Sequence, residues 1–171
     1  LVGAHCAQSL VTRPDAIAPW PKFAGSGRAQ NAFGTHELSF KHPTSSMNHG
    51  TAVLMWSADL SQPARLATPF MLAQTAVAMD SAAELYFTAQ CVELLLPSNS
   101  ARLIGFGSEQ LSLGAYLERA VQDGVKLYAC SQAMHALNYR LTDLAPFVTG
   151  AGGLIQFMAR SQESQWRTLV F

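Results

Sequence analysis

The stretch at residues 124–135 constrains the fold more than any other part of this sequence. Residues 125–129 form a short apolar run with β-branched and aromatic members, which is typical of a buried parallel strand. Cys130 follows this run directly, and residues 131–138 can begin a helix at once. A strand that passes straight into a helix predicts an open α/β sheet, in which reactive groups gather at the carboxyl ends of the strands.

A helical pattern precedes this strand over residues 109–123. Apolar residues recur in it at three- and four-residue spacing, with charged residues on the opposite face. Gly124 then stands where a left-handed C-terminal cap belongs. The segment therefore predicts an amphipathic helix that ends just before the strand begins.

From residue 51 onward, apolar runs of strand length alternate with helical segments. This alternation is typical of a doubly wound α/β domain, which we expect over residues 51–171, or from Met47 if that residue is the true start. Pro63 suits the first turn of the first helix, although Pro69 could mark the start instead. The expected strands are residues 51–57, 82–88, 125–129, 147–149 and 167–171, with a brief extended piece at 102–106, and the expected helices are residues 64–79, 89–96 (a helical turn), 109–123, 131–138 and 154–164.

Residues 1–50 have a different character. Prolines break this segment, clusters of glycine, serine and threonine loosen it, and no helical or strand period persists. We expect an N-terminal tail, a leader or an extension of uncertain order there. Its histidines and Cys6 lack the spacing of metal ligands, so no metal site is expected.

The charge balance limits the classes of partner. Charged residues make up 13% of the chain, hydrophobic residues 49%, and the formal net charge is zero. A neutral chain offers no electrostatic basis for binding nucleic acid or an anionic membrane surface, and no apolar run reaches the length of about 18 residues that spans a membrane. Apolar helical faces with few charges to cover them predict contacts between copies of the chain, and so a homo-oligomer.

The three cysteines, Cys6, Cys91 and Cys130, lie far apart in the sequence. They form no CxxC pair and no Cys/His cluster at zinc spacing. A sparse, odd number of cysteines predicts free thiols in a reducing compartment, which favours a cytoplasmic location over a secreted disulfide scaffold.

Cys130 is the candidate reactive group. A thiol at the start of a helix faces the positive end of the helix dipole, which favours the thiolate, and the backbone amides of Ser131 and Gln132 are expected to face the sulfur. His135 is the nearest titratable side chain, but a spacing of five residues places it on another helical face. A surface or packing role is therefore the simpler interpretation of His135, and a packed, unreactive Cys130 is the alternative for the thiol.

Cys91 also follows a predicted strand. If the strands at 82–88 and 125–129 are neighbours, Cys91 and Cys130 lie on one rim of the sheet. A second, resolving thiol then becomes possible, provided that the two Cα atoms lie within about 7 Å.

A glycine-rich turn with Gly150, Gly152 and Gly153 leads into the last predicted helix. Backbone amides in such a turn can bind an anion. The turn matches neither the dinucleotide-binding pattern GxGxxG nor a phosphate-binding P-loop. A plain tight turn is therefore the simpler interpretation, and a nucleotide- or flavin-binding module is a further alternative.

The order of these elements resembles the DsrE/DsrF-like sulfur-relay family over residues 51–171. The resemblance rests on the pattern Gly-Val-x-hydrophobic-x-x-Cys at residues 124–130 and on the loop 59–65 after the first strand. The glycine-rich turn, the last helix and a final strand that ends in phenylalanine follow in the family's order. One position departs from the family pattern, because Cys91 precedes Val92 where many relatives have glycine before valine.

This resemblance implies a three-layer α/β/α sandwich with a mostly parallel five-stranded sheet, flavodoxin-like in outline, that assembles into trimers or hexamers. It implies a persulfide on Cys130, with sulfur donor and acceptor proteins as partners and no cofactor. Arg65 and Arg140 could supply positive charge near the sulfur. Other family members lack the active cysteine, so a non-catalytic scaffold or binding subunit of the same fold is the alternative.

Overall fold

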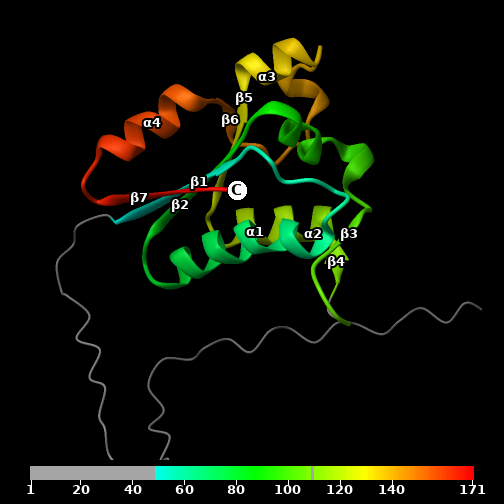
Figure 1. Ribbon diagram of the computed structural model, residues 1–171, viewed down its shortest axis with the longest axis horizontal. Helices are drawn as coiled ribbons and strands as arrows, with labels where there is room; N and C mark the ends of the chain where they lie inside the picture. The colour runs from blue at the N-terminus through cyan, green and yellow to red at the C-terminus, as the bar shows by residue number, and fades with distance from the viewer. Residues whose placement is uncertain (1–48, 109) are drawn as a thin grey trace, which may run out of the picture. The chain divides into compact units, whose positions relative to one another are not determined.

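A parallel sheet forms the centre of the molecule (Figure 1). The computed structural model describes residues 49–171 with the exception of residue 109, so nearly all of the expected tail, with Cys6, lies outside the described residues. Five strands pair in the order β6-β5-β2-β1-β7, and every neighbouring pair is parallel. These strands are β1 (Gly50–Met55), β2 (Ala82–Phe87), β5 (Lys126–Cys130), β6 (Gly150–Gly152) and β7 (Trp166–Val170).

Helices lie on both faces of this sheet, which gives three layers (Figure 1). Two helices cover one face, α1 (Pro63–Ala78) and α2 (Leu113–Gln122), and α4 (Leu154–Gln162) packs on the other. The short helix α3 (Ser131–Ala136) follows β5 at the carboxyl end of the sheet. The expected α/β fold with a five-stranded sheet is confirmed. The remaining elements are the 3-10 helices η1 (Ala89–Leu95), η2 (Pro97–Asn99) and η3 (Leu141–Asp143) and the antiparallel pair β3 (Leu103–Ile104) and β4 (Leu111–Ser112).

Each face of the sheet has its own hydrophobic core. Leu85 and Leu127 belong to the larger core, together with the buried residues of α1 and α2. Tyr86 and Tyr128 point to the opposite face, where their rings stack at 5.2 Å and Phe157 of α4 meets Tyr86 edge-on at 5.8 Å. Because both faces of the central strands are buried, these strands are mostly apolar, and Glu84 in β2 is the buried exception.

The helix expected from residue 109 begins at Leu113 instead. The two residues before it pair with β3, and the Ser112 hydroxyl then caps the helix by accepting a hydrogen bond from the Ala115 amide at 3.2 Å. At the other end Gly124 adopts φ +101°, which confirms the predicted left-handed cap. Pairing between distant residues therefore shortened the helix that the local period predicted.

The structure corrects one further expectation and decides between two starts of the first helix that the sequence left open. The strand expected at residues 147–149 begins at Gly150, because Gly150–Gly152 is the stretch that pairs with β5. Pro69 lies inside α1, whose first helical position is Pro63, where the missing amide hydrogen removes no helical bond.

Gly50 should be the most sensitive glycine of the sheet. A β-carbon at this position would lie 2.4 Å from the indole of Trp166, its partner in the register of β1 and β7. We expect Gly50→Ala to lower the free energy of unfolding by about 1–3 kcal/mol through overpacking, as measured by urea denaturation. Gly150→Ala is the matched control, because a β-carbon there meets nothing within 4 Å, and equal losses in the two variants would contradict this account.

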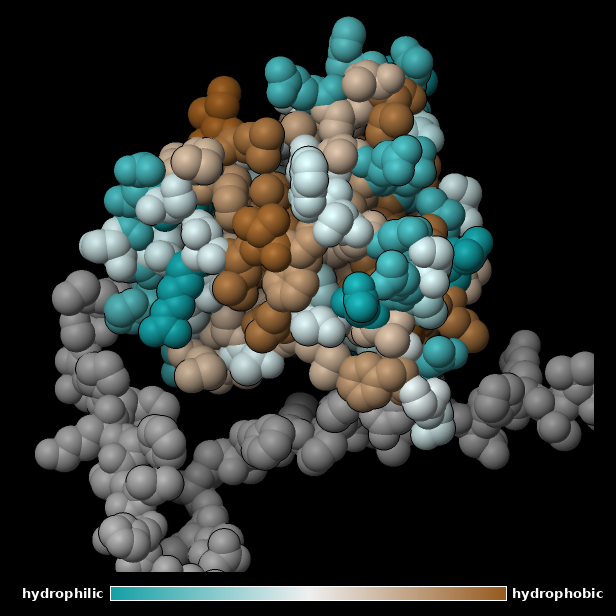
Figure 2. Space-filling view, in the orientation of Figure 1, coloured by the Kyte–Doolittle hydropathy of each residue, from teal (hydrophilic) through white to brown (hydrophobic). Residues whose placement is uncertain are grey.

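The face that carries α4 is incompletely covered. Figure 2 shows hydrophobic side chains gathered over β7 and the upper end of α4. Exposed apolar residues on these elements include Ile155, Met158 and Val170. Such a surface suits the predicted homo-oligomer, which stays a prediction because the structure contains one chain. Within residues 49–171, the helices are too short or too polar to cross a membrane.

Candidate functional site

Cys130 is the last residue of β5 and the residue on which α3 begins. It lies at the carboxyl edge of the sheet, where parallel α/β folds place their reactive groups. The residue is only 5% exposed, so the thiol is more buried than a nucleophile needs to be. Ser131 and Gln132, the next two residues, are exposed, so the chain reaches the surface directly after Cys130.

Four hydrogen-bond donors act on the Cys130 sulfur. They are the Thr88 hydroxyl at the end of β2, the Gln132 and Ala133 amides in the first turn of α3, and the Leu154 amide at the start of α4. We call this set the thiolate cradle. The Cys130 side chain forms no capping hydrogen bond with α3, and these groups act on the sulfur as dipoles that stabilise its negative charge.

The cradle determines the ionisation of the thiol. Burial raises the pKa of Cys130, but the Thr88 hydroxyl and the three amides outweigh burial, so the pKa of the thiol is below its ordinary value. No charged side chain is among these groups. The groups that favour the thiolate are thus dipoles, and its stability depends on where those dipoles are held.

The register of the sheet brings these donors together. Phe87 pairs with Ala129, so Thr88 stands level with Cys130 on the neighbouring strand. On the other side Cys130 pairs with Gly152 of β6. The chain then turns at Gly153, the N-cap of α4, where an added β-carbon would lie 3.5 Å from the Cys130 sulfur.

The predicted anion turn is therefore part of the cysteine site. Gly150 and Gly152 are the ends of β6, and Gly153 is followed at once by the Leu154 amide of the cradle. The sequence indicated an amide donor here but not its target. The geometry assigns that donor to the sulfur, whereas a separate anion site remains only an expectation.

The amides of α3 follow a simple rule of helix geometry. A side chain at the N-cap receives the second and third amides of the helix. With Cys130 as N-cap, these are the amides of Gln132 and Ala133, and both act on the sulfur. Gln132 was expected in this role; Ser131, also expected, is the first helical residue, and its amide is not among the donors found at the sulfur.

Cys91 lies in η1 and has the opposite character. It is 1% exposed, and its thiol donates a hydrogen bond to the Ala58 carbonyl at 3.3 Å. Burial raises the pKa of the Cys91 thiol, and the Asp59 carboxylate acts in the same direction. Both Cys91 and Cys130 are free thiols. Of the two, only Cys130 has surroundings that favour the thiolate.

The two thiols lie at the same edge of the sheet, because β2 and β5 are neighbours. Cys91 borders a pocket of about 270 Å³ that also contacts Trp56 and Asp59 beyond the end of β1. The proposed resolving role of Cys91 stays a prediction, since the thiols are unpaired.

The candidates His135, Arg65 and Arg140 are exposed, and none of them is among the groups found to act on the sulfur. His135 is exposed in the last turn of α3, and within the described part of the chain its side chain forms no hydrogen bond or ion pair. Arg140 pairs with Asp143 at 3.4 Å on the surface, and Arg65 is exposed. Among the described residues, no group of three or more histidine, cysteine or acidic side chains could hold a metal ion.

Sequence reasoning missed the side-chain donor of the cradle. Thr88 was expected only as the end of a strand, and the pairing of Phe87 with Ala129 places it beside Cys130. This position can be inferred only once the order and register of the strands in the sheet are known. The Leu154 amide carries no side-chain signal at all.

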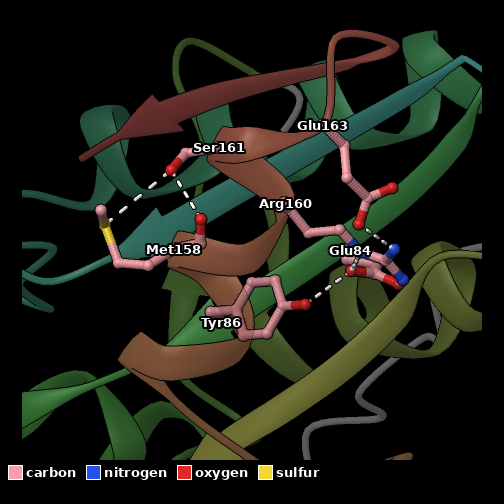
Figure 3. A network of polar contacts seen from close by, with 6 residues as sticks. All are labelled: Glu84, Tyr86, Met158, Arg160, Ser161 and Glu163. Atoms are coloured by element: carbon pink, nitrogen blue, oxygen red, sulfur yellow. Dashed lines mark hydrogen bonds and ion pairs between the residues drawn. The ribbon is translucent and has the colours of Figure 1, made fainter.

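A buried ion pair was also missed (Figure 3). Glu84 is 2% exposed in the middle of β2, and Arg160 of α4 binds its two carboxylate oxygens, each at 2.9 Å. The Tyr86 hydroxyl donates to the same carboxylate at 2.6 Å, and Glu163 accepts from Arg160 at 3.0 Å. A carboxylate inside an apolar strand was the available signal, because such a group requires a partner.

Removal of the Thr88 hydroxyl tests the cradle directly. We expect Thr88→Val to raise the pKa of Cys130, so the pH–rate profile of its alkylation by iodoacetamide moves to higher pH. The rate at pH 7 should fall by about threefold, as for loss of a hydrogen bond worth roughly 0.7 kcal/mol. Thr75→Val is the control, because that hydroxyl donates to the Met71 carbonyl within α1 and is not part of the cradle. An unchanged profile in Thr88→Val would show that the hydroxyl does not act on the thiolate.

The fold and site together define a class: a parallel α/β domain with a stabilised cysteine thiolate at the carboxyl edge of its sheet. The model of the DsrE/DsrF-like family matches residues 51–171, and the chain belongs to that family. The family is linked to sulfur relay in general.

Solved structures support the same fold. The ychN protein from E. coli superposes with a TM-score of 0.57 at 14% identity, covering 72% of this chain and 99% of that one. MTH1491 from Methanobacterium thermoautotrophicum, described as a protein of unknown function, gives 0.53 at 17% identity with the same coverage. At these identities the similarity concerns the fold alone. A comparison with curated protein sequences gave no match.

Proposed function

We propose that this protein carries sulfur as a persulfide on Cys130 and passes it from a donor protein to an acceptor thiol. The observation that supports this function is the thiolate cradle, which lowers the pKa of Cys130 in spite of its burial. A sulfur carrier needs a thiolate that is available at neutral pH. Membership of a family linked to sulfur relay agrees with this assignment.

Loading is a transfer between thiols. The Cys130 thiolate attacks the outer sulfur of a donor persulfide, a new S–S bond forms at Cys130, and the donor's S–S bond breaks. The electron pair leaves with the donor thiolate. The outer sulfur and its proton are now on Cys130, and no external oxidant is required.

Unloading depends on the same cradle. An acceptor thiolate attacks the outer sulfur, and the Cys130 thiolate is the leaving group. A thiolate of lower pKa leaves faster, so the Thr88 hydroxyl and the three amides promote release as well as loading. The dipoles that stabilise the nucleophile therefore also stabilise the product.

A second candidate function is a non-catalytic scaffold or binding subunit. The observation that favours it is the 5% exposure of Cys130, because a donor protein could not easily reach a residue that is so largely covered. Reaction of the native protein with dithionitrobenzoate separates the two functions. In a carrier, Cys130 itself reacts without unfolding, as shown by mapping the modified peptide, whereas in a scaffold Cys130 reacts only once the protein unfolds.

Mass mapping after incubation with glutathione persulfide tests the carrier function. The expected result is the added mass of one sulfur atom on the peptide that contains Cys130, removed by a thiol reductant. Sulfur found only on Cys91 or Cys6, or on none of the three cysteines, would overturn the proposal. On this proposal the partners are donor and acceptor proteins in a reducing compartment, with the homo-oligomer as the working assembly.

A further inference from the structure

Helix α4 is held to the sheet by few apolar contacts. Of its nine residues only Phe157 is buried in the core. Leu154, Ile155 and Met158 are 45%, 90% and 53% exposed. Apolar burial therefore does little to determine where the helix sits along the sheet.

The Glu84–Arg160 pair supplies the missing constraint (Figure 3). The guanidinium makes two parallel hydrogen bonds to the carboxylate, which restrict both distance and orientation. It also lies 4.0 Å above the ring of Trp166, which itself lies against Gly50. The guanidinium of Arg160 is thus held at its edge by Glu84 and at its face by the ring of Trp166.

The same two elements meet again at the cysteine site. Thr88 follows Glu84 by four residues, roughly 13 Å along the strand direction. Leu154 precedes Arg160 by six residues, about 9 Å along the helix axis. The chain segments run in opposite directions, so one end of α4 binds Glu84 and the other lies at the Cys130 sulfur. A β-carbon added to Gly153, the residue before Leu154, would lie 3.5 Å from that sulfur.

We propose that Arg160 is a positioning residue for Cys130: its bond to Glu84 fixes the register of α4 and so holds the Leu154 amide on the sulfur. This inference concerns the thiolate on which the proposed function rests. A shift of α4 by a fraction of its rise per residue would move that amide off the sulfur. The Thr88 hydroxyl and the amides of α3 would still act on the sulfur, so loss of the Leu154 dipole should raise the pKa of Cys130 only in part.

The test is a double-mutant cycle read by the pH–rate profile of Cys130 alkylation with iodoacetamide. Arg160→Lys keeps the charge and loses the two-bond geometry. Leu154→Pro removes the amide hydrogen, together with a leucine side chain that is 45% exposed, at the first helical position, where proline is tolerated. Each variant is expected to move the profile to higher pH and to slow the reaction at pH 7 by about threefold.

The double variant decides the mechanism. If Arg160 acts through the Leu154 amide, Arg160→Lys should add nothing to Leu154→Pro. Additive effects, or an unchanged profile in Arg160→Lys, would overturn the proposal. Arg140→Lys is the matched control, because its pair with Asp143 is on the surface, and it should leave the profile unchanged.

Folding is monitored in the same samples through Cys91, which is 1% exposed and should stay unmodified in a folded protein. If Arg160→Lys exposes Cys91, Tyr86→Phe replaces it in the cycle, because that variant loosens Glu84 and leaves Arg160 in place. It should shift the profile in the same direction, and no shift would overturn the proposal. Persulfide loading is measured separately, so a wild type that fails to load would refute the carrier function without altering this result.

Discussion

Cys130→Ser is expected to abolish persulfide loading and to remove the fast-reacting thiol of the native protein. Serine has nearly the same size, and the hydroxyl suits the same cradle of donors, so the fold should persist. The hydroxyl does not ionise at neutral pH and provides no sulfur to form the S–S bond. The measurement is mass mapping after incubation with glutathione persulfide, together with iodoacetamide labelling of the native protein.

Cys91→Ser is the matched control for this loss. Burial raises the pKa of Cys91, and its thiol donates to a backbone carbonyl, which a serine hydroxyl can also do. Loading of Cys130 should therefore remain in Cys91→Ser. If loading disappears in the Cys91 variant and survives in Cys130→Ser, the assignment of the sulfur carrier is reversed.

Arg160→Met should cause the largest loss of stability among the substitutions considered. It leaves the Glu84 carboxylate, which is 2% exposed, without its cationic partner. Breaking one side of a buried ion pair costs about 3 kcal/mol or more, because the remaining charge stays desolvated. The measurement is the free energy of unfolding from urea denaturation followed by circular dichroism.

An exposed ion pair provides the comparison. The Arg140 side chain is 82% exposed and pairs with Asp143, so Arg140→Met should cost no more than about 1 kcal/mol. The difference between the two methionine variants isolates the effect of burial. Similar losses in both would mean that the Glu84–Arg160 pair is not a constraint on α4.

Much of the fold could be predicted from local patterns. Apolar runs identified β1, β2 and β5, and the proline near residue 63 and the glycine at residue 124 marked helix ends. The errors arose where distant residues pair. Leu111 and Ser112 fit the helical period but form β4, which pairs with β3. The strand expected near residue 147 is instead formed by residues 150–152, which pair with β5.

The sequence by itself determined the class of the domain and the place of Cys130, because both follow from the order of short apolar runs and helical periods along the chain. Only the tertiary structure decided what surrounds the sulfur. Thr88 and the Leu154 amide belong to segments distant in sequence, and the register of the sheet brings them together. Backbone amides are present at nearly every residue, so the sequence does not indicate which of them meet the sulfur. A buried carboxylate such as Glu84 requires a partner, but only the packing of α4 shows that this partner is Arg160.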